Sequence, residues 1–130
     1  MSLAKDLRRI AKDRKQSIEK VYRGTMLAMG SRIIKMSPVD EGRFRGNWFT
    51  GINTENNSTD LNATSASDST ARLLSSVGEL NSNEDFYFMN NLPYAKELED
   101  GSSDQAEDGM VKVTVNDFAS IVELNIRSIR

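Results

Sequence analysis

The chain contains no cysteine and no histidine among its 130 residues. Without cysteine there is no disulfide framework, no thiolate nucleophile and no zinc–thiolate site. Without histidine the chain lacks the commonest general base and the commonest ligand for transition metals. No serine lies in a G-x-S-x-G nucleophile motif, and the sequence contains no phosphate-binding glycine loop. We therefore predict that the protein is not an enzyme, takes no cofactor or metal and has no small-molecule substrate.

Long apolar runs are also missing. No stretch is long enough to span a bilayer, and the N-terminal MSLAKDLRRIAKDRK has no apolar core of the kind that signal peptides contain. We expect no membrane partner. The sequence favours a protein made and used in the cytosol, or in an assembly built there.

The composition is that of an ordinary globular protein, with 38% apolar and 28% charged residues, and predicts one domain over residues 1–130. The net charge of −2 is unevenly distributed. Residues 1–50 hold twelve basic and five acidic residues, a balance of +7, whereas residues 51–130 hold five and fourteen, a balance of −9. Such a dipolar chain can attract copies of itself head to tail as readily as it attracts nucleic acid.

Residues 3–36 have the pattern of one long helix. Apolar residues recur at spacings near three and four, and only Gly24 and Gly30 weaken the pattern: Leu3, Leu7, Ile10, Ile18, Val21, Met29 and Ile33. The first half is charged almost all round, so we expect residues 1–24 to form a projecting helical arm that extends from the body or lies against a neighbour.

Shorter elements follow. Residues 45–52 are predicted to form a strand, and the Asn-, Ser- and Thr-rich residues 53–66 a mobile loop. Ser67 or Asp68 is expected to cap a helix through Leu80, whose apolar contacts would come from four residues: Ala71, Leu73, Leu74 and Val77.

The last third predicts a strand over 85–91 and a helical turn over 94–99, closed by Asp100 and Gly101. Residues 110–115 alternate and are β-branched, which favours a strand, whereas the spacing of apolar residues from Phe118 onwards is helical. The fold class predicted is α+β: a long N-terminal helix on a small antiparallel sheet, with short helices and a C-terminal helix.

The segment Ser37–Phe49, SPVDEGRFRGNWF, is unusual. Pro38 predicts that the long helix ends at about Ser37, and Asp40, Glu41 and Gly42 form a turn signal in which glycine is free to take a positive φ. Arginine and the single tryptophan then occur together, a combination enriched at protein–protein hot spots.

Two charged groups have simpler interpretations. Six carboxylates in the last third lack the order of a calcium loop, so a solvated acidic loop is favoured: Glu97, Glu99, Asp100, Asp104, Glu107 and Asp108. The basic residues of the arm are interleaved with acids and no aromatic residue lies among them to stack on bases. DNA contact is therefore possible but not favoured over a subunit interface.

Two motifs give a family resemblance. SPVDEGRFRGNW resembles the SPVDTGRFRGNW-type motif of a phage minor tail component family, whose members are tail completion or neck proteins of long-tailed phages. Residues 90–110, NNLPYAKELEDGSSDQAEDGM, are similar to the family's NNLPYA-x-x-LE-x-G-x-S-x-QAP-x-GM. Glu41 replaces the usual Thr, and Glu107 the usual Pro. The resemblance favours one C-terminal helix from about Met110 to Ile126.

The resemblance implies a structural virion protein, assembled in the host cytoplasm, that forms a homo-oligomeric ring at the head-proximal end of the tail. Its partners would be its own copies and neighbouring tail or neck proteins. The alternatives are a tail-terminator or stopper ring, or a DNA-binding accessory protein that uses the basic helix.

Six residues form the interface hypothesis. Arg43 and Arg45 would pair with carboxylates such as Glu97 or Glu99, within the subunit or across to the next, and Trp48 and Tyr94 would add apolar contacts. On this hypothesis, replacing Arg45 with Glu weakens ring formation more than monomer stability.

Overall fold

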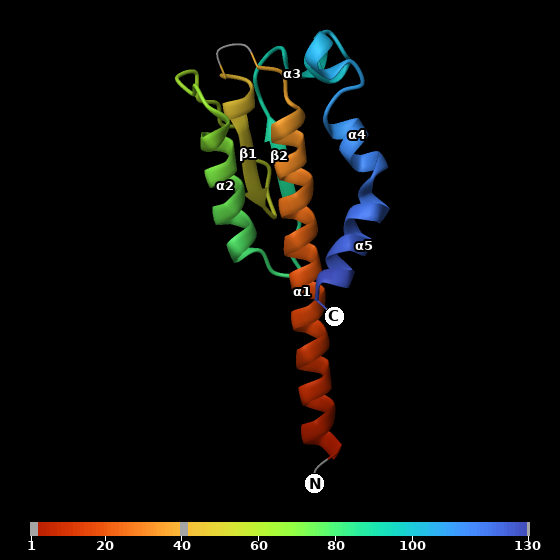
Figure 1. Cartoon of the computed structure of the whole chain (residues 1–130). Helices are drawn as coiled ribbons and strands as arrows, with labels where there is room; N and C mark the ends of the chain where they lie inside the picture. The colour runs from red at the N-terminus through yellow and green to blue at the C-terminus, as the bar shows by residue number, and fades with distance from the viewer. Residues whose placement is uncertain (1–2, 40–41, 130) are drawn as a thin grey trace.

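The computed structural model describes residues 3–39 and 42–129. Helix α1 (Leu3–Met36) has the predicted bounds and runs through the body and beyond it as a projecting arm (Figure 1). It ends where Pro38 disfavours helical geometry in the preceding residue. The turn residues Asp40 and Glu41 lie outside the described residues, but Gly42 has the expected positive φ of 78°.

A two-stranded sheet forms the second layer. Strands β1 (Trp48–Ile52) and β2 (Phe86–Asn90) pair antiparallel, with Trp48 opposite Asn90. Both strands were predicted, but β1 begins three residues later than expected because the 3-10 turn η1 (Arg45–Asn47) precedes it. That turn is closed by a hydrogen bond from the Asn47 N–H to the Phe44 carbonyl, 3.0 Å long.

Helix α2 (Ala66–Glu79) connects the two strands. The prediction of its cap was wrong, because the Ser65 side chain accepts from the Ser67 N–H and starts the helix earlier. Of the four apolar residues expected to pack, Leu73 and Val77 are buried, whereas Ala71 and Leu74 face solvent.

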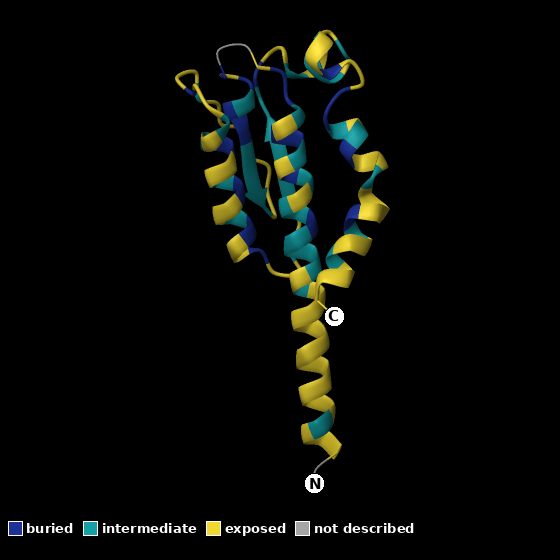
Figure 2. Cartoon of the chain, in the orientation of Figure 1, coloured by how far each residue is buried: buried dark blue, intermediate teal, exposed yellow. Residues whose placement is uncertain are grey.

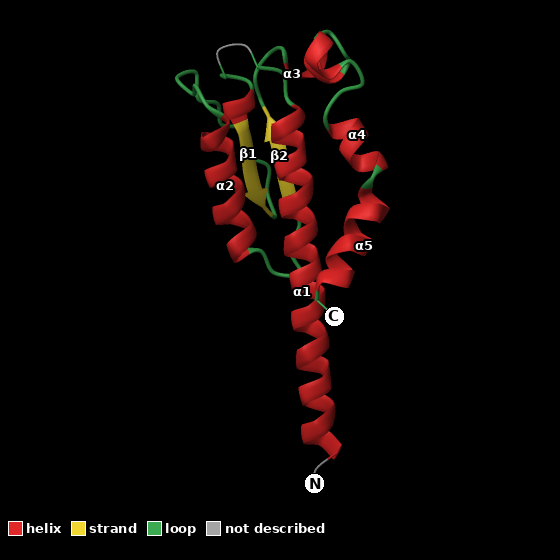
Figure 3. Cartoon of the chain, viewed as in Figure 1, coloured by secondary structure: helices red, strands yellow, loops and turns green. Residues whose placement is uncertain are grey.

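The chain then forms α3 (Ala95–Glu99), which was predicted, and the 3-10 turn η2 (Asp104–Ala106). The C-terminal segment is helical, so the local alternation that favoured a strand was misleading. It is also not one helix: α4 (Val111–Asn116) and α5 (Phe118–Ser128) are separated at Asp117, whose N–H bonds three residues back to Thr114 (Figure 3).

The elements pack in a simple order. Helices α1 and α2 lie side by side with the two-stranded sheet behind them, and α4 and α5 follow the other flank of α1 (Figure 1). The core lies where the upper half of α1 meets α2, the strands and the start of α4, and consists of Ile33, Ile34, Phe44, Trp48, Leu73, Val77, Leu92, Ala106 and Met110.

The lower part of α1 is exposed almost throughout, as Figure 2 shows in yellow. Part of the range 1–24, which was expected to project, nevertheless packs on the body. The Tyr22 hydroxyl donates to the Glu84 carbonyl at 2.6 Å, and Arg23 Nε donates to the Leu80 carbonyl at 2.5 Å. The free arm is therefore shorter than residues 1–24, because the last turn of that range already holds the end of α2.

The loop before α2 is held by side chains from the body. Buried Asn47 accepts from the Asp60 N–H through Oδ1 at 2.8 Å and donates through Nδ2 to the Asp60 carbonyl at 2.8 Å. Asn91 Nδ2 donates to the carbonyls of Asn56 and Ser58. The loop is mostly exposed, as predicted, and is fixed at several points; its mobility stays a prediction.

Candidate functional site

Ser37 joins the end of α1 to the first strand. It is fully buried, and its hydroxyl donates to the Ile33 carbonyl at 2.7 Å and accepts from Trp48 Nε1 at 2.9 Å. The hydroxyl therefore satisfies one carbonyl of the last helical turn and the indole N–H together. The start of the SPVDEGRFRGNWF segment acts within the subunit.

Arg45 also acts within the subunit, at the C-terminus of α1. Its guanidinium donates to the Ser37 carbonyl through Nε at 3.0 Å and Nη2 at 2.6 Å, and to the Lys35 carbonyl at 3.0 Å. A cation at this position satisfies carbonyls that the helix leaves free and interacts favourably with the helix dipole. Within the subunit, Arg45 therefore caps α1 instead of pairing with Glu97 or Glu99.

Trp48 lies in the core. Only 4% of its surface is exposed; its ring stacks on Phe88 with centroids 5.1 Å apart and meets Phe44 edge-on at 5.8 Å. A neighbouring subunit could reach Trp48 only if this core opened. Tyr94, by contrast, is 36% exposed and packs on Phe44 at 6.0 Å, so part of its ring remains accessible to a partner.

The two motifs that carry the family resemblance meet each other. Asn90 Nδ2 donates to the Phe44 carbonyl at 2.9 Å. Farther along, the Gln105 side-chain amide makes a reciprocal pair with the backbone of Val39, accepting at 2.9 Å and donating at 3.1 Å. The motif residues therefore hold the turn after α1 to the segment that leads into α4.

Glu99 is the cap of α4. One carboxylate oxygen accepts from the N–H groups of Met110 and Val111, at 3.0 and 2.9 Å, and the other accepts from Lys112 at 2.9 Å. Burial by itself raises the pKa of Glu99, but the three backbone hydrogen bonds and the Lys112 charge outweigh it and lower that pKa below its ordinary value of 4.5. Within the subunit, Glu99 therefore binds a helix N-terminus instead of Arg43 or Arg45.

The cap predicts a pH-dependent contribution to stability. Because the pKa of Glu99 is lower in the folded chain, its contribution is present above the unfolded pKa and is lost as the pH falls through the folded pKa. We expect Glu99→Gln to lower the free energy of unfolding by about 1–2 kcal/mol at neutral pH, and the difference to shrink in acid. Urea unfolding between pH 7 and pH 3 measures it. Exposed Glu97→Gln is the control, and a difference independent of pH would contradict the assignment.

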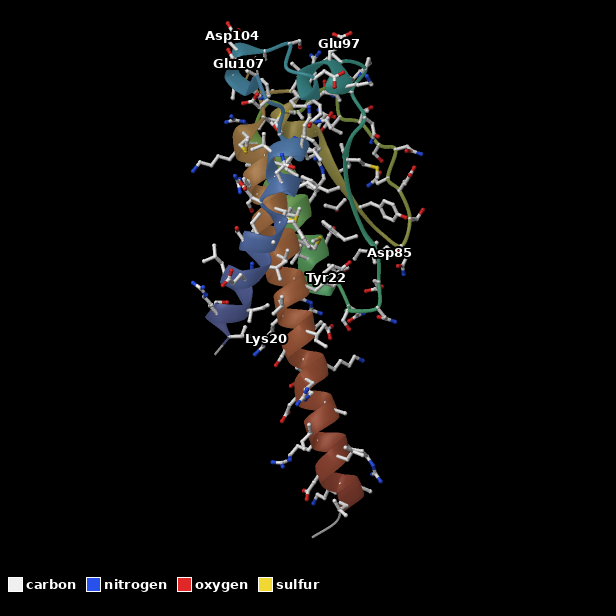
Figure 4. The ribbon with its side chains drawn as sticks, turned by 90° about the vertical axis from the view of Figure 1, so that its right-hand side faces the viewer. Lys20, Tyr22, Asp85, Glu97, Asp104 and Glu107 are labelled. Carbon is white, nitrogen blue, oxygen red and sulfur yellow. The ribbon has the colours of Figure 1, made fainter. Side chains whose placement is uncertain are left out.

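The remaining predicted carboxylates lie on the surface. Figure 4 shows Glu97, Asp104 and Glu107 at the end of the molecule opposite the free end of the arm. Among the residues that the structure describes, no group of three or more acidic side chains is placed to hold a metal ion. Arg43 is exposed, as are Glu97 and Asp100, and none of the ion pairs found in the described chain joins Arg43 or Arg45 to Glu97 or Glu99.

Sequence reasoning missed a groove between α1 and α5. It has a volume of about 490 Å³ and is lined mainly by apolar side chains: Ser17, Ile18, Val21, Tyr22, Thr25, Met26, Phe118, Val122, Ile126 and Ile129. Ile18 is 61% exposed and Phe118 46%. We call it the α1/α5 groove. The helical spacing of Phe118, Val122, Ile126 and Ile129 was the available signal, but it did not say which element those residues would face.

The arm carries a second uncovered apolar surface. Leu3, Leu7 and Ile10 follow one another at spacings of four and three, so they share one face of the helix. Their exposed fractions are 87%, 69% and 45%. We call these three residues the arm stripe.

Comparisons of the chain with protein-family models, curated proteins and solved structures found no match. Within the described residues, no helix is long and apolar enough to cross a membrane.

Proposed function

We propose that this chain is a structural virion protein of a long-tailed phage. It acts in tail completion at the junction between head and tail, and it assembles there as a homo-oligomeric ring. The observation that supports an assembly role best is the arm. A helical projection with three exposed aliphatic residues on one face is an uncovered apolar patch of the kind that marks interaction sites.

The distribution of charge along the molecule supports a heterologous contact between copies. Residues 3–16 of the arm hold six basic and two acidic residues, a charge of +4, and the rest of the chain holds eleven and seventeen, a charge of −6. The carboxylates of Glu97, Asp104 and Glu107 lie at the far end from the arm (Figure 4). A ring requires two different faces that attract one another and close, and a positive arm and a negative body give the subunit two such faces.

The family resemblance supports the place of that ring in a virion. Its two motifs supply the residues that join α1, η1, β2, α3 and α4, including Ser37, Arg45, Asn90 and Glu99. Because the resemblance is concentrated in residues that determine the fold, it favours an architecture shared with that family. The surfaces that contact other subunits would then lie elsewhere on the chain.

Electron microscopy of the purified protein, together with mass spectrometry of phage particles from the same genome, tests the proposal. We expect rings in solution, and the same protein at the head-proximal end of the tail in intact particles. A protein that is absent from the particles would overturn the virion role. A ring located at another level of the tail would instead favour a terminator or stopper.

A charge placed in the arm stripe is expected to block assembly. Leu7→Glu should change the free energy of unfolding of the monomer by less than about 0.5 kcal/mol, because Leu7 is exposed, yet should remove the rings. Sedimentation velocity measures the assembly. Arg9→Gln makes the same change in net charge elsewhere on the same helical turn and should leave the rings intact. If the Leu7→Glu variant formed rings at the same protein concentration as the wild type, the arm stripe would be excluded from the interface.

A further inference from the structure

We propose that the α1/α5 groove of one copy receives the arm of a second copy, with the arm stripe against the apolar floor of the groove. This inference rests on the self-assembly proposed above, but not on the virion role. Both surfaces belong to the same chain, so every copy offers one stripe and one groove. Docking between copies therefore leaves neither kind of surface uncovered in a closed assembly.

The arm cannot fill the groove of its own chain. It is the straight continuation of α1, and α1 itself forms one wall of the groove (Figure 1). Reaching that wall would require the helix to break, and no proline or kink interrupts Leu3–Met36. The occupant must therefore come from another molecule.

The dimensions of the two surfaces agree. The stripe-bearing arm, residues 3–16, is roughly 21 Å long at 1.5 Å per residue, and α5 with its 11 residues is roughly 16 Å long. A groove between two adjacent helices accepts side chains of a third helix spaced by three and four residues, which is the spacing of Leu3, Leu7 and Ile10.

The groove is preformed. Gly24 allows a close approach of α1 and α5, because a Cβ atom at that position would collide with the side chain of Asn125. Arg32 on α1 also forms an ion pair with Asp117, which fixes the start of α5. The groove is therefore present in the single chain, and a partner helix does not have to open it, which lowers the cost of binding.

The charges favour this occupant over an uncharged helix. The arm is positive and the remainder of the chain is negative, so the arm of one copy is attracted to the body of another. Charges beside the groove already pair with one another, as in Glu19 with Arg23 and Glu123 with Arg127. The attraction therefore comes from the negative charge of the body as a whole, and these two ion pairs leave the charges that they join largely neutralised beside the groove.

Disulfide cross-linking tests the contact, because the natural chain has no cysteine to compete. A tagged Leu7→Cys chain is mixed with an untagged Val122→Cys chain, dissociated, reassembled and oxidised. The matched control replaces Leu7→Cys by Arg9→Cys, which lies two residues away on another face of the arm. A disulfide requires Cβ atoms within about 4.5 Å, so we expect at least about tenfold more mixed product with Leu7→Cys than with Arg9→Cys.

Three outcomes would overturn the inference. Equal yields from the Leu7→Cys and Arg9→Cys chains would show that collision, not docking, brings the thiols together. Mixed product that forms better between Leu7→Cys and Asp104→Cys than with Val122→Cys would place the arm at the acidic end of the next copy. A protein that remains monomeric has no such contact. A positive cross-link in a protein absent from phage particles would support the docking while overturning the virion role.

Discussion

Replacing Trp48 with alanine is expected to lower the free energy of unfolding by about 3–5 kcal/mol, the largest effect of any change considered. The indole is 4% exposed, stacks on Phe88 and meets Phe44 edge-on. Its removal leaves a cavity between α1 and the sheet. The Ser37 hydroxyl also loses the hydrogen bond that it accepts from the indole N–H. Because domains of this size are stable by only about 5–15 kcal/mol, the variant would lose a large part of its stability. Urea unfolding followed by circular dichroism measures the change.

Tyr94→Ala is the control for Trp48, because Tyr94 packs on the same Phe44 ring but is 36% exposed. We expect it to cost about 1 kcal/mol. The comparison of the two variants distinguishes a core role of Trp48 from a role in the contact between subunits. If Trp48→Ala kept its stability and lost only its ability to assemble, the residue would be an interface contact, as the sequence hypothesis held. A large loss of stability in the monomer would instead confirm its place in the core.

Replacing Arg45 with glutamate is expected to lower the free energy of unfolding by about 2–4 kcal/mol. The change removes three hydrogen bonds to the carbonyls of Lys35 and Ser37. It also places a carboxylate beside the negative end of α1, where it repels those carbonyls. The effect should therefore appear in the monomer, which reverses the order expected from sequence, where the ring was to be weakened more than the monomer.

Arg43→Glu is the matched control, since it makes the same charge change two residues away at an exposed position. It should change stability by less than about 0.5 kcal/mol. Arg45→Lys tests the geometry, because lysine keeps the charge but cannot bind two carbonyls with a planar fork. Thermal unfolding of the three variants distinguishes the cap from an interface. Wild-type stability in Arg45→Glu with loss of assembly would return Arg45 to the interface.

The elements that the sequence predicted well are those set by local physics. The bounds of α1 follow from helical periodicity and from Pro38, and the turn at Gly42 follows from the freedom of glycine at positive φ. Strand β2 and helix α3 were also found, because aromatic residues and the Asp100–Gly101 ending give local signals. Each signal lies within a few residues of the structure that it predicts.

The elements that the sequence predicted poorly depend on residues that lie far away along the chain. Residues 110–115 alternate like a strand, but Glu99 accepts from the N–H groups at the start of this segment and Thr114 is buried, so the chain forms α4 instead. Whether an arginine caps a helix or pairs with a carboxylate is likewise decided by which backbone lies beside it. For Arg45 that backbone is the end of α1, at Lys35 and Ser37.

The sequence by itself determined the α+β class, the long helix and the charge split, and it supplied the two motifs on which the proposed phage role rests. Only the tertiary structure decided that Trp48, Arg45 and Glu99 serve the fold of one subunit, and that α1 and α5 form an uncovered apolar groove. The physical reason is that local propensity and periodicity act between neighbours along the chain. Burial and hydrogen-bond partners are instead set by segments that meet only when the chain has folded.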